Sequence, residues 1–538
     1  MSFPPPPTAP GGPSQPAQPP FGAPPGPGAP GAQPFPQQQP PFGAPPFGAA
    51  PQPPGQQPPY GAPPFGAAPQ PPYAGPFGGP QPPYGAPDPY GPPPERPRRL
   101  GLKVLVGVGG TILGLTALVG GLVVYKLASN PGPEPLTPAA SPWQTLADGL
   151  TSALAAKDEE AFLRRFKGDE VREQQRKVFR NLVKIPWEQA SWEASVPDSN
   201  HRIQVVFVHQ IKGADVKPVG ETYSWTVEPG DTAPWITGVG GYQGIDGKVS
   251  QSSYYPAPWD VYDNLAVENR DSLVIVADQS QAGEVKRDAD TLAQAARDDL
   301  AAWRKNAPTT APGKQAAGGF FVVLEKRREV YNKLYAGEGK VNDSLEAGVN
   351  LSVPAYAPTE PGKRETGGSR IVMDTSLSRF TMDDWKLGVT DIGRHEMGHA
   401  IVAPLRSSPG YSAGSRGTQS WVAEGFAEYM ATRGKDDIAK QEAQATLKGY
   451  TFDGRLPEEL TFYSKESKDR SAHYVLGGMA LRYMGQKYGE AKVFAFVAAH
   501  YNEPDKLREQ ITEATGLSQE QFEKEWSAWV RSSVPGIR

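Results

Sequence analysis

Cysteine is absent from this chain of 538 residues, and charged side chains are absent from Met1 to Pro87. Without cysteine the protein forms no disulfide bond, so any metal site must use histidine and carboxylate ligands. Histidine is also scarce, with six in the whole sequence. The 54 basic and 58 acidic residues nearly balance, at a formal net charge of −4. This balance gives no indication of a nucleic-acid surface.

Proline, glycine and glutamine dominate residues 1–95, and the segment APPFGAAPQPP occurs twice, at Ala44–Pro54 and Ala62–Pro72. Such a composition has too few aliphatic side chains to offset the entropy lost on folding. We therefore expect residues 1–95 to be a disordered tail with partial polyproline II character. A cytoplasmic partner that binds proline-rich segments is an open alternative role for it.

The run Val104–Tyr125 contains no charged residue and would measure about 33 Å as a helix. That length predicts a transmembrane helix at 104–125, with the lipid bilayer as a partner. Basic residues flank its N-terminal side more than its C-terminal side, which predicts a single-pass cell-membrane protein with a cytoplasmic tail and an extracytoplasmic remainder. The flanking basic residues are Arg96, Arg98, Arg99 and Lys103 before the run and Lys126 after it.

A proline-rich stalk is expected at 128–142, and a small α+β domain at 143–247. Apolar residues first recur at helical spacing, and Asp158 is a candidate N-cap. Alternating segments at 191–196, 202–211 and 221–228 then predict antiparallel strands. This order is similar to NTF2-like or cystatin-like domains.

The remaining residues, 256–538, form a second predicted domain. Leu273–Asp278, Gly319–Glu325 and Arg370–Ser376 are expected to be strands, and Glu284–Lys305 an amphipathic helix. Strands that alternate with helices indicate a layer of sheet covered by helices. The predicted fold class of the whole chain is therefore α+β.

The segment Asp391–Pro404 contains His395, Glu396 and His399 in the arrangement H-E-x-x-H. Residues four apart lie on one face of a helix, so the two imidazoles can bind one ion. Glu396 beside them is a candidate general base for a water molecule on that ion. The alternative is two solvent-facing histidines at a coincidental spacing.

A second helix is predicted at Ser420–Gly434, with Ser420 as its N-cap. Glu424 and Glu428 share one face of it. A catalytic zinc ion has three protein ligands, so Glu424 is the candidate third ligand. Glu428 is then the candidate outer carboxylate that accepts a hydrogen bond from a ligand histidine. Solvated glutamates on a helix surface are the alternative.

HEMGH followed by WVAEGFAEY resembles the gluzincin metallopeptidases, in particular the peptidase MA or M1-like catalytic domain. The resemblance implies a zinc ion held by His395, His399 and Glu424, with Glu396 as the base. The helix Ser471–Gly489 is similar to the helix whose tyrosine stabilises the oxyanion, a position that Tyr474 occupies here. Leu476 and Gly478 depart from that motif, and the Gly-x-Met-Glu-Asn motif is not found. An endopeptidase therefore fits better than an aminopeptidase.

The predicted function is a membrane-anchored zinc-dependent peptidase that acts on a peptide or protein substrate outside the membrane. An extended substrate is expected to pair with the edge of the sheet near Arg370–Ser376. The main alternative is a catalytically silent surface protein that uses the metallopeptidase fold as a scaffold. A third hypothesis makes the tail the main functional part.

Overall fold

The computed structural model describes residues 141–198, 200–244, 248–310, 312–335, 347–357, 363–406, 408–409, 417–464 and 466–538. The predicted disordered tail, the segment 104–125 and nearly all of the predicted stalk lie outside these residues.

The prediction of a single-pass membrane protein is corrected by this structure. None of the helices in the described part of the chain is both long enough and apolar enough to cross a bilayer. The segment 104–125, on which the prediction depended, lies outside that part. We therefore withdraw the membrane span, the bilayer as a partner and the extracytoplasmic placement, and state the fold class as α+β, with helices and two main sheets.

The first part of the described chain has three helices followed by a four-stranded antiparallel sheet in the order β1-β2-β3-β4. The side chain of Asp158 accepts a hydrogen bond from Ala161 N at 2.9 Å and caps the second helix, as predicted. The predicted strands at 202–211 and 221–228 are confirmed, whereas the glycine-rich fourth strand was not predicted. The elements are α3 (Pro142–Ala156), α4 (Glu159–Leu163), α5 (Asp169–Leu182), β1 (Trp187–Ala194), β2 (Arg202–Ile211), β3 (Val219–Glu228) and β4 (Trp235–Gly241).

A five-stranded mixed sheet follows, in the order β5-β6-β7-β10-β8. Strand β10 lies between β7 and β8, so the prediction of a sheet edge near Arg370–Ser376 is wrong, and β8 is the edge strand on that side. The elements are α6 (Pro258–Val261), β5 (Leu265–Arg270), β6 (Leu273–Asp278), α7 (Ala282–Asn306), β7 (Phe320–Glu325), α8 (Arg328–Lys333), β8 (Gly348–Pro354), β9 (Lys363–Arg364) and β10 (Thr366–Asp374).

Both faces of the five-stranded sheet are buried, which explains the continuous apolar runs of β6 and β7. In β6, Leu273 and Ile275 belong to the core that contains α7 and α9 (Trp385–Val402), whereas Val274 and Val276 belong to the core of the first sheet and its helices. One hydrophobic core therefore runs across the boundary predicted between residues 247 and 256.

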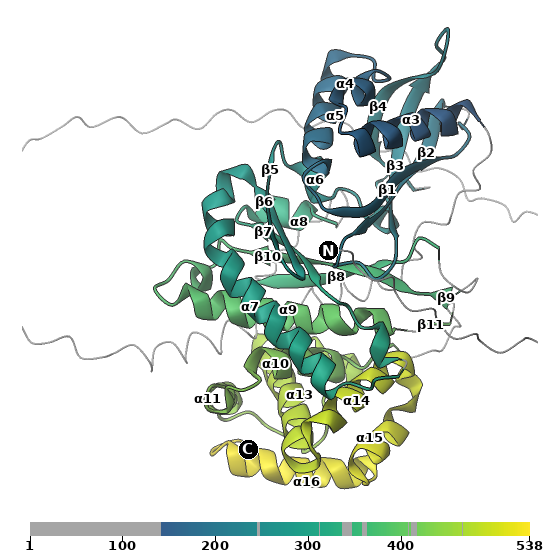
Figure 1. The fold of residues 1–538 in the computed structure, drawn as a ribbon. Helices are drawn as coiled ribbons and strands as arrows, with labels where there is room; N and C mark the ends of the chain where they lie inside the picture. The colour runs from purple at the N-terminus through teal and green to yellow at the C-terminus, as the bar shows by residue number, and fades with distance from the viewer. Residues whose placement is uncertain are drawn as a thin grey trace, which may run out of the picture. The chain divides into compact units, whose positions relative to one another are not determined.

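The C-terminal part is helical and packs on α9, which lies alongside α7 (Figure 1). Helix α10 contacts α9 on one side and α13 on another. The remaining elements are β11 (Ser408–Pro409), α10 (Ser420–Thr432), α11 (Asp436–Leu447), α12 (Glu459–Phe462), α13 (Ser467–Tyr488), α14 (Glu490–Asn502), α15 (Leu507–Thr515) and α16 (Gln519–Ser533).

Glycines permit α10 to approach both of its neighbours closely. A Cβ atom at Gly425 would lie 2.6 Å from the main-chain carbon of Gly477 on α13. A Cβ atom at Gly398 on α9 would lie 3.2 Å from Cα of Ala427 on α10. The three helix backbones are therefore in near contact, and α10 has little freedom to shift.

Gly425→Ala is expected to destabilise the protein by about 1–3 kcal/mol, because the added methyl group overlaps backbone that cannot rotate away. Chemical denaturation followed by tryptophan fluorescence measures the change. Gly283→Ala in α7 is the matched control, since no atom lies within 4 Å of the Cβ it adds. Equal midpoints for Gly425→Ala and wild type would contradict the close contact.

Candidate metal centre

Helix α9 presents two histidines to the same point. The helix starts after Asp384 and ends at Val402, two residues before Pro404, which cannot continue a helix. The rings of His395 and His399, one turn apart, have centroids 5.0 Å from each other. His395 is buried and His399 is half-buried.

Glu424 on α10 completes a group of three metal-binding side chains. Its Oε2 atom lies 3.2 Å from His399 Nε2 and 3.6 Å from His395 Nε2. One ligand atom from each residue lies within 4.8 Å of the others, and the described residues contain no second group of this kind. Zinc bonds of about 2.0–2.2 Å at tetrahedral angles separate ligand atoms by about 3.3–3.5 Å. The two nitrogens and the carboxylate are of the types that zinc prefers, and the carboxylate lies close to this distance from each nitrogen.

The electrostatics of this group favour a positive charge at its centre. Burial opposes the charged form of Glu424, but His399 and His395 outweigh burial and hold the pKa of Glu424 well below its ordinary value. Burial likewise opposes protonation of His395, but the carboxylates of Glu424 and Glu428 raise its pKa well above the ordinary value. A divalent cation bound between these side chains would supply that positive charge without a proton.

Glu428 lies behind His395, one turn after Glu424 on α10. Its Oε1 atom is 3.4 Å from His395 Nδ1, the ring nitrogen directed away from Glu424. No described residue other than Glu428 is a partner for that nitrogen. A carboxylate in this position fixes the ring orientation of His395 and the tautomer with a free Nε2.

Glu396 lies between α9 and the start of β8. A Cβ atom at Gly348 would lie 2.9 Å from Glu396 Cγ, so only glycine allows this carboxylate its position. Burial raises the pKa of Glu396, whereas the two histidines and a hydrogen bond donated by Asn350 N–H lower it. The carboxylate is thus fixed beside the two histidine ligands and held by a main-chain donor.

Tyr463, which the sequence did not indicate, reaches the metal ligands directly. Its hydroxyl donates a hydrogen bond to Glu424 Oε1 at 2.9 Å. Burial and the adjacent Glu424 raise the pKa of this hydroxyl well above its ordinary value, so it stays a donor. Tyr474 is buried on α13, with its ring centroid 6.4 Å from that of Tyr463. Its role in oxyanion stabilisation stays a prediction.

Two side chains from distant segments fix the start of α10. Ser420 is the first helical residue and not the N-cap that the sequence predicts, because Glu459 on α12 caps the helix instead. Glu459 accepts hydrogen bonds from Ser420 N at 2.6 Å and Ser420 Oγ at 2.8 Å. His500 Nε2 accepts a hydrogen bond from Gln419 N at 3.0 Å. These contacts hold the turn that precedes Glu424.

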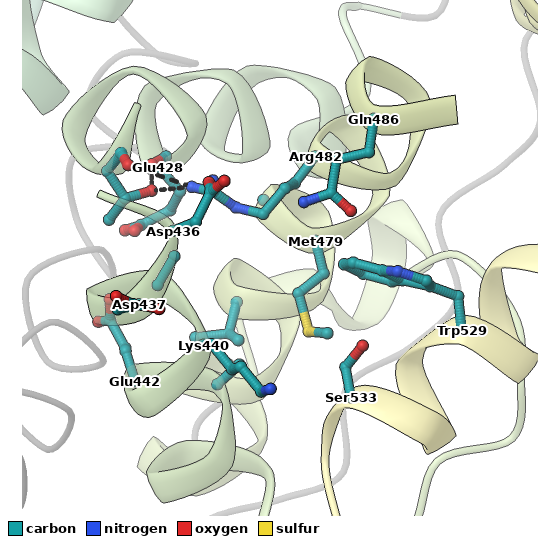
Figure 2. Close-up of a pocket in the computed structure, with 15 residues that line it drawn as sticks. Glu428, Asp436, Asp437, Lys440, Glu442, Met479, Arg482, Gln486, Trp529 and Ser533 are labelled. Carbon is teal, nitrogen blue, oxygen red and sulfur yellow. Dashed lines mark hydrogen bonds and ion pairs between the residues drawn. The ribbon is translucent and has the colours of Figure 1, made fainter. Parts of the chain in front are cut away.

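A cavity of about 250 Å³ lies on the other side of Glu428, among α10, α11, α13 and α16 (Figure 2). His395, His399 and Glu424 do not line it, so it is separate from the metal centre. Arg482 reaches across it and contacts Asp436 and the Thr432 hydroxyl. Glu428 therefore lies between this cavity and His395.

The structure therefore brings His395, Glu396, His399, Glu424 and Glu428 together from α9 and α10. The sequence analysis missed Tyr463, Glu459, Asn350 and His500. Local spacing gives no signal for the first three, since each reaches the site only through the tertiary fold. His500 carries a weak signal, because it lies in the otherwise apolar run Val493–Tyr501. No protein-family model and no curated protein matches this chain.

Acid is expected to destabilise the protein through His500. Burial of the imidazole lowers the pKa of His500 from 6.5 to about 4, although the hydrogen bond between its ring and Gln510 acts in the opposite direction. Between pH 6.5 and pH 4 the imidazole of His500 is protonated in the unfolded chain but stays neutral in the folded chain. Stability is therefore complete above pH 6.5 and falls towards pH 4, by on the order of 3 kcal/mol.

Denaturation of the wild type and His500→Gln at several pH values measures this effect. The variant is expected to lose less stability than the wild type between pH 6.5 and 4. Substitution of the exposed His201 by asparagine, as a control, should leave the wild-type profile unchanged. Parallel profiles for the wild type and His500→Gln would show that His500 does not titrate in this range.

Proposed function

We propose that this chain is a zinc-dependent peptidase with His395, His399 and Glu424 as ligands and Glu396 as the general base. The observation that carries the proposal is the convergence of three ligand atoms within 4.8 Å, with the Glu396 carboxylate fixed beside them. When bound, zinc supplies a Lewis acid that activates water at neutral pH and polarises a carbonyl group. The membrane anchor is not part of this proposal.

Glu396 moves the proton in this reaction. It removes a proton from the attacking water, whose oxygen forms a bond to the scissile carbonyl carbon. The carbon–nitrogen bond then breaks, and the proton passes from Glu396 to the leaving amine. The raised pKa of the Glu396 carboxyl group suits both steps, since an acceptor must also be able to donate.

A tyrosine hydroxyl stabilises the charge that develops on the carbonyl oxygen. The hydrogen bond between Tyr463 and the Glu424 carboxylate supports this role for Tyr463. Only the similarity to the family motif supports it for Tyr474. Loss of one such donor costs about 3–4 kcal/mol in the transition state. We assign the role to Tyr463, whose hydroxyl remains protonated at neutral pH and would turn its single proton from Glu424 Oε1 to the carbonyl oxygen as the charge develops.

The outer edge of β8 is the binding surface for an extended substrate, because β8 begins at Gly348 beside Glu396. A peptide strand added there would form main-chain hydrogen bonds with β8 and bring a peptide bond to the base. Strand β8 thus takes the place of β10 as the strand that pairs with the substrate, because β10 lies inside the sheet and β8 lies at its edge.

The purified protein is expected to bind close to one equivalent of zinc and to hydrolyse peptides in a mixed-sequence library. Glu396→Gln should keep the zinc and lose hydrolysis by at least a thousandfold, because the ligands remain and the base is removed. Glu424→Ala should lose most of the zinc. Metal analysis and peptide mass spectrometry provide the measurements.

Two outcomes would contradict this proposal. Less than about half an equivalent of zinc in the wild type after reconstitution would exclude the metal centre. Full zinc occupancy without hydrolysis of any peptide would favour the catalytically silent scaffold instead.

Tyr463→Phe and Tyr474→Phe are expected to differ in their effect on kcat. Removal of the Tyr463 hydroxyl should lower kcat by about 100-fold or more with a small change in KM, since the contact acts in the transition state. Tyr474→Phe is the matched change one helix away and should lower kcat by less than tenfold. Steady-state kinetics on one library-derived peptide measures both. The reverse order would restore Tyr474 as the oxyanion donor.

A further inference from the structure

The main-chain groups of β8 alternate between its partner β10 and its outer edge. Ala347 O accepts a hydrogen bond from Asp374 N, and Ala355 N donates to Glu365 O. The odd-numbered residues therefore point their N–H and C=O groups at β10, and the even-numbered residues point theirs outwards. Asn350 N–H follows this rule, since it donates to Glu396 and not to β10.

Among the described residues, no strand pairs with the outer edge of β8 between Gly348 and Pro354. The main-chain N–H and C=O groups of the even-numbered residues point along that edge, and Asn350 N–H has the Glu396 carboxylate as its acceptor. An edge of this kind can pair with an added strand, which supplies the main-chain partners.

The far end of that edge is closed by the first α+β part of the chain. Tyr356 N, which points outwards by the same alternation, donates to Pro218 O at 2.8 Å. Val219 forms an antiparallel bridge with Ala355. We call residues 216–219, at the junction of the β2–β3 connection with β3, the end wall.

The end wall is in direct contact with the first residues of β10. Val216 N and Lys217 N both donate to Gly367 O, at 2.8 and 3.0 Å. A Cβ atom at Gly367 would lie 2.6 Å from a Val219 methyl group and 3.0 Å from Ala355 Cα. No residue with a side chain fits there, so the end wall and the strand pair are in full contact.

A buried ion pair fixes the end wall. Arg370 on β10 is 1% exposed and donates to both carboxylate oxygens of Asp215, at 2.6 and 3.1 Å. Asp215 also accepts from Ile211 N at 2.8 Å. Buried His209 is neutral, since burial and Arg370 lower its pKa, and its Nε2 lies 3.3 Å from Arg370 Nη2. Separation of this pair would leave a buried charge, so the end wall stays in place.

We propose that residues 216–219 limit the substrate to a short segment on the N-terminal side of the scissile bond. This inference rests on the proposed function. A peptide antiparallel to β8 enters at the Pro354 end and reaches Glu396 at the Gly348 end. The six steps between these residues span about 20 Å, room for about five substrate residues. The substrate class is therefore peptides cut within about five residues of their N-terminus.

A series of peptides with one to ten residues before the same scissile bond tests this limit. The parent sequence is one that the wild type cleaves in a mixed-sequence library. We expect kcat/KM to rise until about five residues precede the bond and to fall at least fivefold at eight or more. Equal cleavage of the five-residue and ten-residue peptides would overturn the proposal.

Asp215→Asn distinguishes the end wall from a general loss of stability. The amide keeps the volume of the carboxylate but cannot accept from both Arg370 and Ile211 at its nitrogen, so the connection loosens. We expect the ratio of kcat/KM for five-residue peptides to kcat/KM for ten-residue peptides to fall at least threefold, while short peptides are cleaved as by the wild type. Lys212→Ala, in an exposed residue of the same connection, is the control and should behave as wild type. A uniform loss at all lengths would count against the end wall.

Photo-crosslinking gives a result that does not depend on turnover. Glu396→Gln protein loaded with zinc is irradiated with peptides that carry a benzophenone side chain at their N-terminus. With five residues before the scissile bond, the crosslink is expected within 216–219, and with two residues it is not. Crosslinks elsewhere at every length would overturn the inference. Failure of the wild type to cut any peptide would instead overturn the proposed function.

Discussion

The position of α10 between α9 and α13 is the constraint on which the candidate metal centre depends. The two histidines come from one helix and are placed by local geometry, but the third ligand must be brought to them by packing. Gly398 and Gly425 remove the side chains that would hold the helices apart. Because Glu424 Oε2 lies 3.2 Å from His399 Nε2, a shift of about 1 Å in α10 would take it out of zinc-binding range.

The same packing explains why the start of α10 is held by several contacts. A helix held only by side-by-side packing can still slide along its axis, and such a shift would move Glu424 away from the two histidines. Glu459 and His500 hold the first turn from two other helices and prevent this movement. Glu459 also places a negative charge at the positive end of the helix, which favours the helix itself. Stability and ligand placement are therefore served by the same two side chains.

The sequence predicts what depends on local periodicity. The histidine pair on one helix face and the apolar strands β6 and β7 are properties of short segments, and the structure agrees with them. Glu424 is on a predicted helix, and its meeting with the histidines is predicted from the need of a catalytic zinc ion for a third protein ligand and from the family resemblance. Tyr463 and Asn350 could not be predicted, since they reach Glu424 and Glu396 only through long-range contacts. Strand β8 was also missed, although Val349, Leu351 and Val353 alternate with Asn350 and Ser352 as in a half-buried strand.

The membrane span is the prediction that the structure corrects, and its loss changes no argument about the site. The placement of Glu396 depends on β8, and β8 depends on the sheet whose second face is covered by the first α+β part. Strand β8 is seven residues long, with the base at one end and the end wall at the other. A rigid strand fixes the distance between its ends, so the proposed base and the proposed substrate limit cannot vary independently. The first α+β part is thus joined to the chemistry through a shared core, a buried ion pair and the two ends of one strand.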